Sequence, residues 1–279
     1  MIFSFILASK GHRIELIRSF LLSLLKSSEQ SFEVIIVCQD ERAYLDPLLE
    51  EFQSLNLKVV YTPSGLSKAR NVGLNYAIGE IIAFPDDDCE YTETTLGHVN
   101  DFFSDNPYYG LLSISCWNLN QTKKLSFVSL NVDSELVISN TFEGVSSISI
   151  FHRKILNQRF DERFGLGAVW NSSEEFDYVV QLLSKGIKGK FIKEIRVLHP
   201  DNNVIDFEKL KEKVKKNSLG HGAYLKKHRS NLGLKVTMSH LWIRPILGAV
   251  FYFLSFRLKR AILSYLSLTN RVRSYFKFS

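Results

Sequence analysis

Cysteine is scarce in this sequence. Only three copies occur among 279 residues, Cys38, Cys89 and Cys116, and no two of them form a Cys-x-x-Cys pair. An odd and widely spaced set argues against a disulfide framework and against a cysteine zinc site. Free cysteines fit a reducing compartment, so we expect a cytoplasmic protein.

Long uninterrupted apolar segments are also missing. The longest, from Leu241 to Leu254, is broken by Arg244 and Pro245 and is shorter than the ~20 apolar residues of a membrane-spanning helix. The opening MIFSFIL has neither a basic residue before it nor a small-residue cleavage site after it. We therefore expect it to form a buried first strand rather than a signal peptide.

Acidic residues almost vanish from the C-terminal part. Residues 209–279 contain 16 lysines and arginines but a single acid, Glu212, whereas residues 1–208 contain 19 basic and 28 acidic residues. The formal net charge of +6 therefore averages an acidic body with a basic tail. Such a split indicates a partner with a negatively charged surface.

The N-terminal half alternates between strand and helix patterns. Short apolar runs typical of buried strands occupy Phe3–Ala8, Val34–Cys38, Lys58–Tyr61 and Ile81–Phe84. Apolar residues at helical spacing predict helices between them, after Arg13, across 45–52, and after Ser67 as a cap. This alternation predicts an α/β fold with a mostly parallel sheet.

The pattern changes after about residue 110. Strand patterns cover Leu111–Cys116, Leu125–Leu130 and Val145–Phe151, a helix pattern covers Glu174–Lys185, and a further strand ends at 197–200. From Phe207 onward the pattern is helical only. We therefore predict two parts, a domain at 1–205 and a helical region at 206–279.

Three consecutive carboxylates follow the fourth predicted strand, in the segment IIAFPDDDC. Ligands bind at strand carboxyl ends in open α/β sheets, and alternate residues of an extended chain face the same way. Asp86 and Asp88 can therefore address one cation, with Mg²⁺ or Mn²⁺ favoured by oxygen ligands. The alternative is a solvated acidic turn.

The segment GLSKARNVG, one strand earlier, places Lys68 and Arg70 near the start of a helix. Such a position suits a bound phosphate group. The alternative is that Arg70 only pairs with an acid at the surface.

Several segments together resemble the family 2 glycosyltransferases with a GT-A fold. They are FSFILASKGHR, FEVIIVCQD, GLSKARNVGLNYAIGEIIAFPDDDC, FDERFGLG and SSEEFDYVVQLLSKG, in this order over about residues 1–200. A weaker likeness continues through VLHPD and GHGAYLKKH, which are similar to a bacterial branch acting in polysaccharide assembly. The resemblance implies a Rossmann-like mixed sheet, a nucleotide-sugar donor, a divalent metal ion and inversion at the anomeric carbon.

The resemblance also implies roles for single residues. The donor is expected to contact the loop after the first strand, the acid after the second strand, the SKARN segment and the acidic cluster. The residues concerned are Ala8, Ser9, Lys10, Asp40, Lys68, Arg70, Asn71, Asp86 and Asp87. Asp40 matches the residue that recognises the base, although the usual pair of acids is Gln39-Asp40 here. The metal ligands are Asp88, Asp86 and, as a third ligand, His199. A satisfied histidine at a strand end is the alternative for His199.

The catalytic base is expected in the segment Glu174-Glu175-Phe176-Asp177. The family has Glu-Asp followed by a third acid two residues on, so Glu175 matches the catalytic position with one extra methylene. It would take a proton from the acceptor hydroxyl, with Asp177 and Glu174 as alternatives. The same acids can instead simply enrich the first turn of a helix.

Lysine and arginine alternate with aromatic and aliphatic residues in the tail. This is typical of interfacial helices that lie on anionic lipid. Nucleic acid is the less favoured partner, because residues 241–268 are too apolar for a solvated arm. Packing on the catalytic domain and homodimer formation are further alternatives.

We therefore expect a peripheral enzyme at the cytoplasmic face of the cell membrane, active in cell-surface polysaccharide synthesis. It would extend a polyprenyl-phosphate-linked glycan from a nucleoside-diphosphate sugar, most simply a UDP-sugar. A non-catalytic membrane scaffold is the first alternative, because of the Glu-for-Asp difference at Glu175. A nucleotidyltransferase is the second, and the lack of a glycine-rich phosphate loop argues against it.

Overall fold

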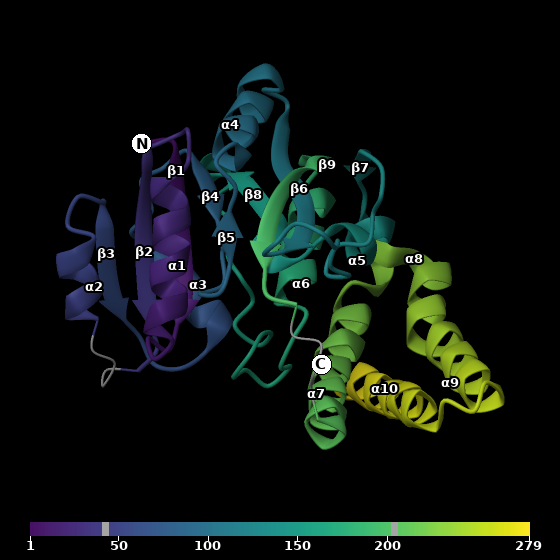
Figure 1. Cartoon of the computed structure of the whole chain (residues 1–279). Helices are drawn as coiled ribbons and strands as arrows, with labels where there is room; N and C mark the ends of the chain where they lie inside the picture. The colour runs from purple at the N-terminus through teal and green to yellow at the C-terminus, as the bar shows by residue number, and fades with distance from the viewer. Residues whose placement is uncertain (41–44, 202–205) are drawn as a thin grey trace.

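The computed structural model describes residues 1–40, 45–201 and 206–279. Its strands are β1 (Phe3–Ser9), β2 (Phe32–Cys38), β3 (Leu57–Tyr61), β4 (Ile81–Ala83), β5 (Glu90–Tyr91), β6 (Tyr109–Asn118), β7 (Ser134–Leu136), β8 (Ile150–Arg153) and β9 (Lys188–His199). They form one mixed sheet in the order β3-β2-β1-β4-β8-β6-β9-β5, with β7 also paired to β9 (Figure 1).

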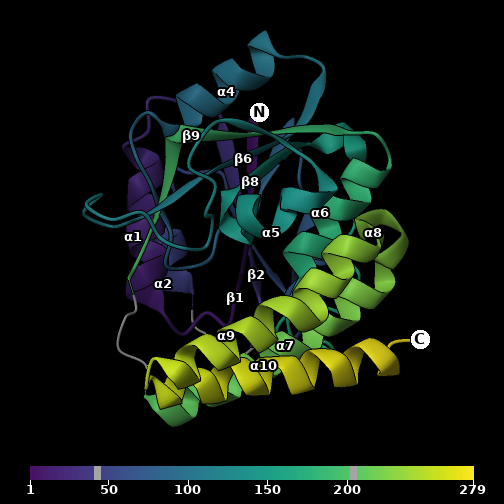
Figure 2. The same cartoon turned by 90° about the vertical axis from the view of Figure 1, so that its right-hand side faces the viewer.

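The N-terminal half of the sheet is parallel. β1 pairs in parallel with β2 and β4, and β2 pairs in parallel with β3. The helices of this part of the chain are α1 (Ile14–Leu25), α2 (Asp46–Glu51), α3 (Leu66–Leu74), α4 (Thr95–Asp105), α5 (Thr141–Gly144) and α6 (Glu174–Ser184). Figure 2 shows α1 and α6 on opposite sides of the sheet. Helices on both faces explain why every residue of β2 is buried, and the predicted α/β alternation is confirmed.

The other half of the sheet mixes strand directions. β8 is antiparallel to both β4 and β6, while β9 runs parallel to β6. This arrangement brings the carboxyl end of β9 to the same edge as those of β1, β2 and β4. The acidic cluster after β4 and His199 at the end of β9 therefore become neighbours.

Three local predictions were wrong. Leu125–Leu130 forms no strand, because Leu125 and Val128 anchor a loop in the core and apolar residues alone do not distinguish such a loop from a strand. Within Val145–Phe151 the strand begins only at Ile150. Ser67 does not cap α3: Gly65 precedes the helix with a φ of 143°, and the Ser67 hydroxyl donates to the Phe164 carbonyl at 2.6 Å.

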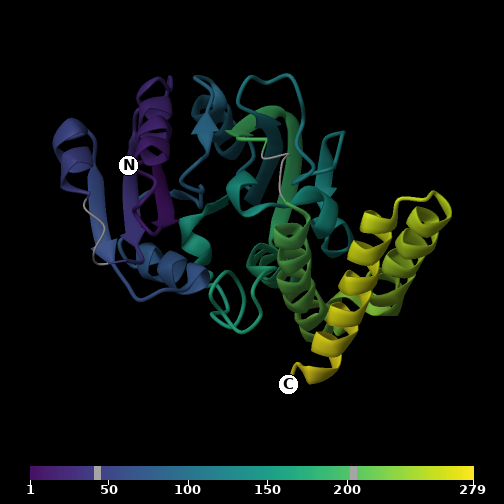
Figure 3. The same ribbon diagram turned by 60° about the horizontal axis from the view of Figure 1, so that its bottom comes forward.

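Helices alone make up the described chain beyond residue 206, as predicted. They are α7 (Phe207–Lys227), α8 (Arg229–Met238), a π-helical turn at Ser239–Ile243, α9 (Arg244–Leu254) and α10 (Leu258–Lys277). Figure 3 shows α10 lying between α7 and α9. Among the described residues, none of the helices combines the length and the apolar character that a bilayer crossing requires. The predicted boundary after residue 205 adjoins residues 202–205, which lie outside the described residues.

A second hydrophobic cluster joins the helical region to the sheet domain. Tyr224 of α7 is fully buried, and its ring lies 5.3 Å from that of Phe142 and 6.0 Å from that of Phe176 on α6. Gly222 allows α10 to approach α7, because a Cβ there would overlap the Arg271 carbonyl. The two parts of the chain thus share a core.

Candidate active site

A cavity of about 660 Å³ lies at the carboxyl ends of the strands. We call it the carboxyl-end cavity. It is lined by the loop after β1, the residue after β2, the chain around the start of α3, the acidic cluster after β4, the loop 165–171 and α7, with Ala8, Ser9, Lys10, Arg13, Gln39, Leu66, Asp86, Asp87, Leu166, Gly167, Asn171 and Lys216 among its residues. Of the predicted donor-binding residues, Ala8, Ser9, Lys10, Asp86 and Asp87 thus reach one space.

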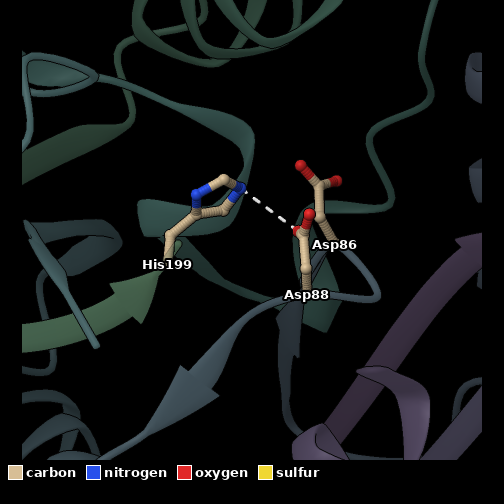
Figure 4. A group of neighbouring side chains, drawn as sticks. All are labelled: Asp86, Asp88 and His199. Atoms are coloured by element: carbon tan, nitrogen blue, oxygen red, sulfur yellow. Dashed lines mark ion pairs between the residues drawn. The ribbon is translucent and has the colours of Figure 1, made fainter. Parts of the chain in front are cut away.

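Asp86, Asp88 and His199 converge beside this cavity (Figure 4). One ligand atom from each lies within 4.8 Å of the others. The His199 Nδ1–H donates to the Pro200 carbonyl at 2.8 Å. The His199 Nε2 lies 3.1 Å from Asp88 Oδ1, and a protonated imidazole pairs with that carboxylate. Once the imidazole is neutral, two carboxylates and one imidazole form a ligand set that suits Mn²⁺.

The protonation states of the cluster reflect its shared charge. Burial raises the pKa of the Asp86 carboxyl, and the positive charge of Arg70 only partly opposes this rise. Burial also acts to raise the pKa of Asp88, but His199 and Arg13 outweigh it and lower that pKa. Burial acts to lower the pKa of His199, but the Asp88 carboxylate outweighs it and raises that pKa. A divalent cation would replace these neighbours as the compensating charge.

Asp87 shapes the loop after β1. Its buried carboxylate accepts the Ser9 hydroxyl at 2.6 Å and an ion pair from Arg13. Arg13 also donates to Asp88 at 2.9 Å, so it bridges both acids. Sequence reasoning missed Arg13, although the signal was present in the segment SKGHR. Lys10 is exposed at the cavity wall.

Arg70 is the most enclosed cation of the site. Its side chain is 1% exposed and lies between Asp86, at 3.4 Å, and Glu174, at 3.2 Å. The guanidinium also lies over the Phe160 ring, 5.4 Å from its centre. Because Arg70 contacts both Asp86 of the acidic cluster and Glu174 of α6, it fixes the distance between that cluster and the helix.

The remaining donor-site predictions have different surroundings. Asn71 does not line the cavity: its amide bonds the Phe160 carbonyl at 3.0 Å and accepts from the Phe160 N–H at 2.9 Å, which fixes the loop before residue 164. Lys68 is exposed on α3 and is not among the cavity residues. Asp40 is not among the cavity residues either, and its carboxylate lies 3.0 Å from Nε2 of His12, which does line the cavity.

Glu175 faces a second cavity, of about 290 Å³, which we call the α6 cavity. Phe127, Ser146, Phe176, Asn217 and His221 also line it. Glu175 Oε2 is buried without a hydrogen-bond partner within the described residues. Burial and the negative charge of Glu174 raise the pKa of Glu175. An unpaired carboxylate with an elevated pKa in a cavity is suited to proton abstraction.

Asp177 is tied to the helical region instead. It is fully buried, and its Oδ1 lies 2.6 Å from Lys227 Nζ and 2.7 Å from His228 Nε2. Its Oδ2 accepts the Gln181 amide at 2.8 Å. Both oxygens are therefore occupied, which argues for an anchoring role rather than for proton transfer from an acceptor.

The family is decided by a match that spans these elements. A family model described as glycosyl transferase family 2 matches residues 4–164, from β1 through the acidic cluster to the loop before α6. The chain belongs to glycosyl transferase family 2. No curated protein sequence matches it.

Solved structures share the fold of this glycosyltransferase. Residues 1–349 of TarS from S. aureus, in complex with UDP, superpose with a TM-score of 0.59 at 19% identity, over 99% of this chain and 89% of that one. The mannosyltransferase PcManGT from Pyrobaculum calidifontis, in complex with GDP-Man and Mn²⁺, gives 0.59 at 13% identity, over 98% and 73%. This chain spans 54% of a longer TarS structure. At sequence identities this low, the superpositions establish a common fold alone.

Several parts of the candidate site lie beyond residue 164, where the family match ends. They include Glu175 on α6, His199 on β9 and Lys216 on α7. The loop 165–171 also belongs here: Gly165 and Gly167 have φ values of 98° and 86°, and the Leu66 N–H donates to the Leu166 carbonyl at 3.0 Å. The segment FDERFGLG, which carries part of the family resemblance, thus contributes Leu166 and Gly167 to the cavity wall.

Proposed function

We propose that this protein is an inverting, metal-dependent glycosyltransferase that uses a nucleoside-diphosphate sugar, with a UDP-sugar as the first candidate. The observation that carries the proposal is the group of Asp86, Asp88 and His199, whose ligand atoms lie within 4.8 Å of one another, beside a cavity large enough for a nucleotide sugar. The structures bound to UDP and to GDP-Man with Mn²⁺ support the same class of donor.

The chemistry follows from the two cavities. Asp86, Asp88 and His199 would hold the cation, which offsets the negative charge of the departing diphosphate when it is bound. Glu175 in the α6 cavity takes the proton of the acceptor hydroxyl as that oxygen attacks the anomeric carbon. Arg70 keeps Glu174 in place through their 3.2 Å contact. Attack and departure on opposite sides of the sugar invert the anomeric centre.

Metal binding and donor turnover test this proposal. Mn²⁺ should raise the melting temperature of the full chain, and Asp88→Ala and His199→Ala should abolish that rise together with UDP-sugar turnover. Asp101→Asn on the exposed face of α4 is the matched control, because this acid lies outside the cluster. Undiminished turnover by Asp88→Ala, or by the wild type in excess chelator, would refute the metal assignment.

A non-catalytic scaffold is the alternative that the Glu175 substitution suggests. It predicts that the wild type binds a nucleotide sugar but releases no nucleoside diphosphate with any acceptor. A nucleotidyltransferase would instead release pyrophosphate from a nucleoside triphosphate. Assays of nucleoside diphosphate release from nucleotide sugars and of pyrophosphate release from nucleoside triphosphates distinguish the three alternatives.

We further propose that the connection between α9 and α10 associates with an anionic membrane surface. Phe256 is 91% exposed there, and the apolar residues Phe253, Leu254 and Leu258 are exposed beside it. Arg257, Lys259 and Arg260 lie in the same segment. Exposed aromatic side chains next to basic ones match the chemistry of an anionic lipid surface. A peripheral position at the cytoplasmic face would place the site near a lipid-linked glycan acceptor.

Vesicle sedimentation tests the membrane proposal. The wild type should bind vesicles containing phosphatidylglycerol and should bind neutral vesicles weakly, and Phe253→Ser with Phe256→Ser should abolish the binding. Ile155→Ser is the matched control, because Ile155 is 88% exposed but lies outside the helical region. Absence of vesicle binding, with a wild-type dimer that the double variant disrupts, would assign this surface to a second copy instead.

A further inference from the structure

One cation of the carboxyl-end cavity comes from outside the family match. Lys216 belongs to α7, and it lines the cavity together with Ser9, Asp86 and Gly167. It also lines a neighbouring groove of about 570 Å³ with Lys209 and Lys213. The helical region therefore contributes positive charge to the space where the donor is expected.

A close helix–loop contact sets the position of Lys216. Gly220 lies directly against Ser172, so that a Cβ on Gly220 would lie 2.5 Å from the Ser172 carbonyl oxygen. The Ser172 hydroxyl donates to the Asn217 carbonyl at 2.8 Å. Residues four apart lie on the same face of a helix, so Lys216 faces the same loop one turn earlier, where that loop forms the cavity wall.

Lys216 forms no salt bridge among the described residues, in contrast to its neighbours, although its charge helps to lower the pKa of Glu212. Lys211 pairs with Glu208 at 2.8 Å, and Lys215 pairs with Glu212 at 2.6 Å. No ion pair of Lys216 occurs in the described part of the chain.

The arginines near the cavity are already engaged. Arg13 is bound by Asp87 and Asp88, and Arg70 is bound by Asp86 and Glu174. A ligand with several negative charges therefore needs a cation that is not yet committed. A lysine ammonium is a compact charge with three donors, and it binds phosphate oxygens well.

We infer that Lys216 binds the diphosphate of the nucleotide-sugar donor and that α7 thereby completes the donor site. The inference rests on the proposed function, since it takes a nucleoside diphosphate as the ligand. The helical region then has a role in donor binding in addition to any contact with a membrane.

Calorimetric titration of the full chain with UDP and UMP tests the inference. Lys216→Ala should weaken UDP binding about tenfold, the effect of one charge-assisted hydrogen bond, and should weaken UMP binding much less, because UMP lacks the second phosphate. Lys216→Arg should restore most of the UDP affinity. Lys215→Ala is the matched control on the same helix, because Lys215 pairs with Glu212 and lines neither cavity.

The outcomes separate this inference from the proposed function. A wild-type chain that binds neither nucleotide overturns the inference together with the assignment of a UDP-sugar as the donor. A wild type that binds UDP, with equal affinity in Lys216→Ala, overturns only the role of Lys216. Equal weakening of UDP binding and UMP binding in Lys216→Ala also overturns the role of Lys216, because the lost charge would then act on any nucleotide and not on the diphosphate. A melting curve of each variant confirms that it is folded.

Discussion

Replacement of Asp177 distinguishes an anchor from a catalytic base. Asp177 is fully buried and contacts Lys227, His228 and Gln181 at 2.6, 2.7 and 2.8 Å. Removal of one partner from a buried ion pair costs about 3–5 kcal/mol. Lys227 keeps a second partner in Asp161 at 2.8 Å, so we expect Asp177→Ala to cost about 3 kcal/mol. For a chain of this size that is a fall of roughly 6–12 °C in melting temperature.

Guanidinium unfolding and thermal melting measure this cost. Asp161→Ala is the control, because it removes the more exposed partner of Lys227 and leaves the Asp177 contact intact. Asp161 also bonds Arg163, so we expect a measurable cost, but a smaller one than for Asp177→Ala because Asp161 is less buried. If Asp177→Ala unfolds like the wild type and binds UDP normally but loses turnover, the anchoring argument is refuted and Asp177 is the base.

Three further predictions concern the α6 acids and the glycines of the helical region. Glu175→Gln should abolish transfer, and it should raise the melting temperature at pH 8 but not at pH 4. Burial raises the folded-state pKa of Glu175, so above the unfolded-state pKa the ionisation of Glu175 favours the unfolded wild type, and glutamine removes this effect. An equal shift of the melting temperature at both pH values would contradict this. Glu174→Gln should move the acid limb of the pH–rate profile to lower pH, because the charge of Glu174 helps to raise the pKa of Glu175. Gly222→Ala should destabilise the chain by about 1–2 kcal/mol in chemical unfolding despite better helix propensity, because the new methyl group overlaps Ser274 of α10. Gly248→Ala, with its nearest neighbour 3.2 Å away, should be nearly neutral.

Local sequence patterns predicted where the two carboxylates of the candidate metal site lie. Asp86 and Asp88 follow a buried strand, so a parallel sheet places them at the ligand-binding edge whatever the rest of the chain does. His199 joined them through the resemblance to the family, and the structure brings its Nε2 within 3.1 Å of Asp88. β8 lies antiparallel between β4 and β6, so that β9 runs in the same direction as β4. The prediction for His199 did not depend on knowing this strand order.

Long-range contacts explain what the sequence could not show. Asp177 matched a motif position, but its partner His228 lies 51 residues away, and no local pattern reveals such a contact. In the sequence, the lysines of α7 are only part of the basic tail. In the structure Lys211 and Lys215 pair with acids on their own helix, whereas Lys216 reaches the carboxyl-end cavity. Periodicity identifies a helix and its faces but does not identify what each face meets.

The contact between Asp177 and His228 also bears on how the protein is made. A ribosome adds roughly 5–20 residues per second, so α6 emerges about 3–10 s before the histidine 51 residues downstream can reach it. During that interval the nascent chain carries a carboxylate destined for the interior without its cationic partners. We therefore expect the sheet to form early and α6 to settle only after α7 has been synthesised. Ribosome-bound chains ending before residue 227 should be cleaved by protease at α6, and chains that extend past α10 should be protected.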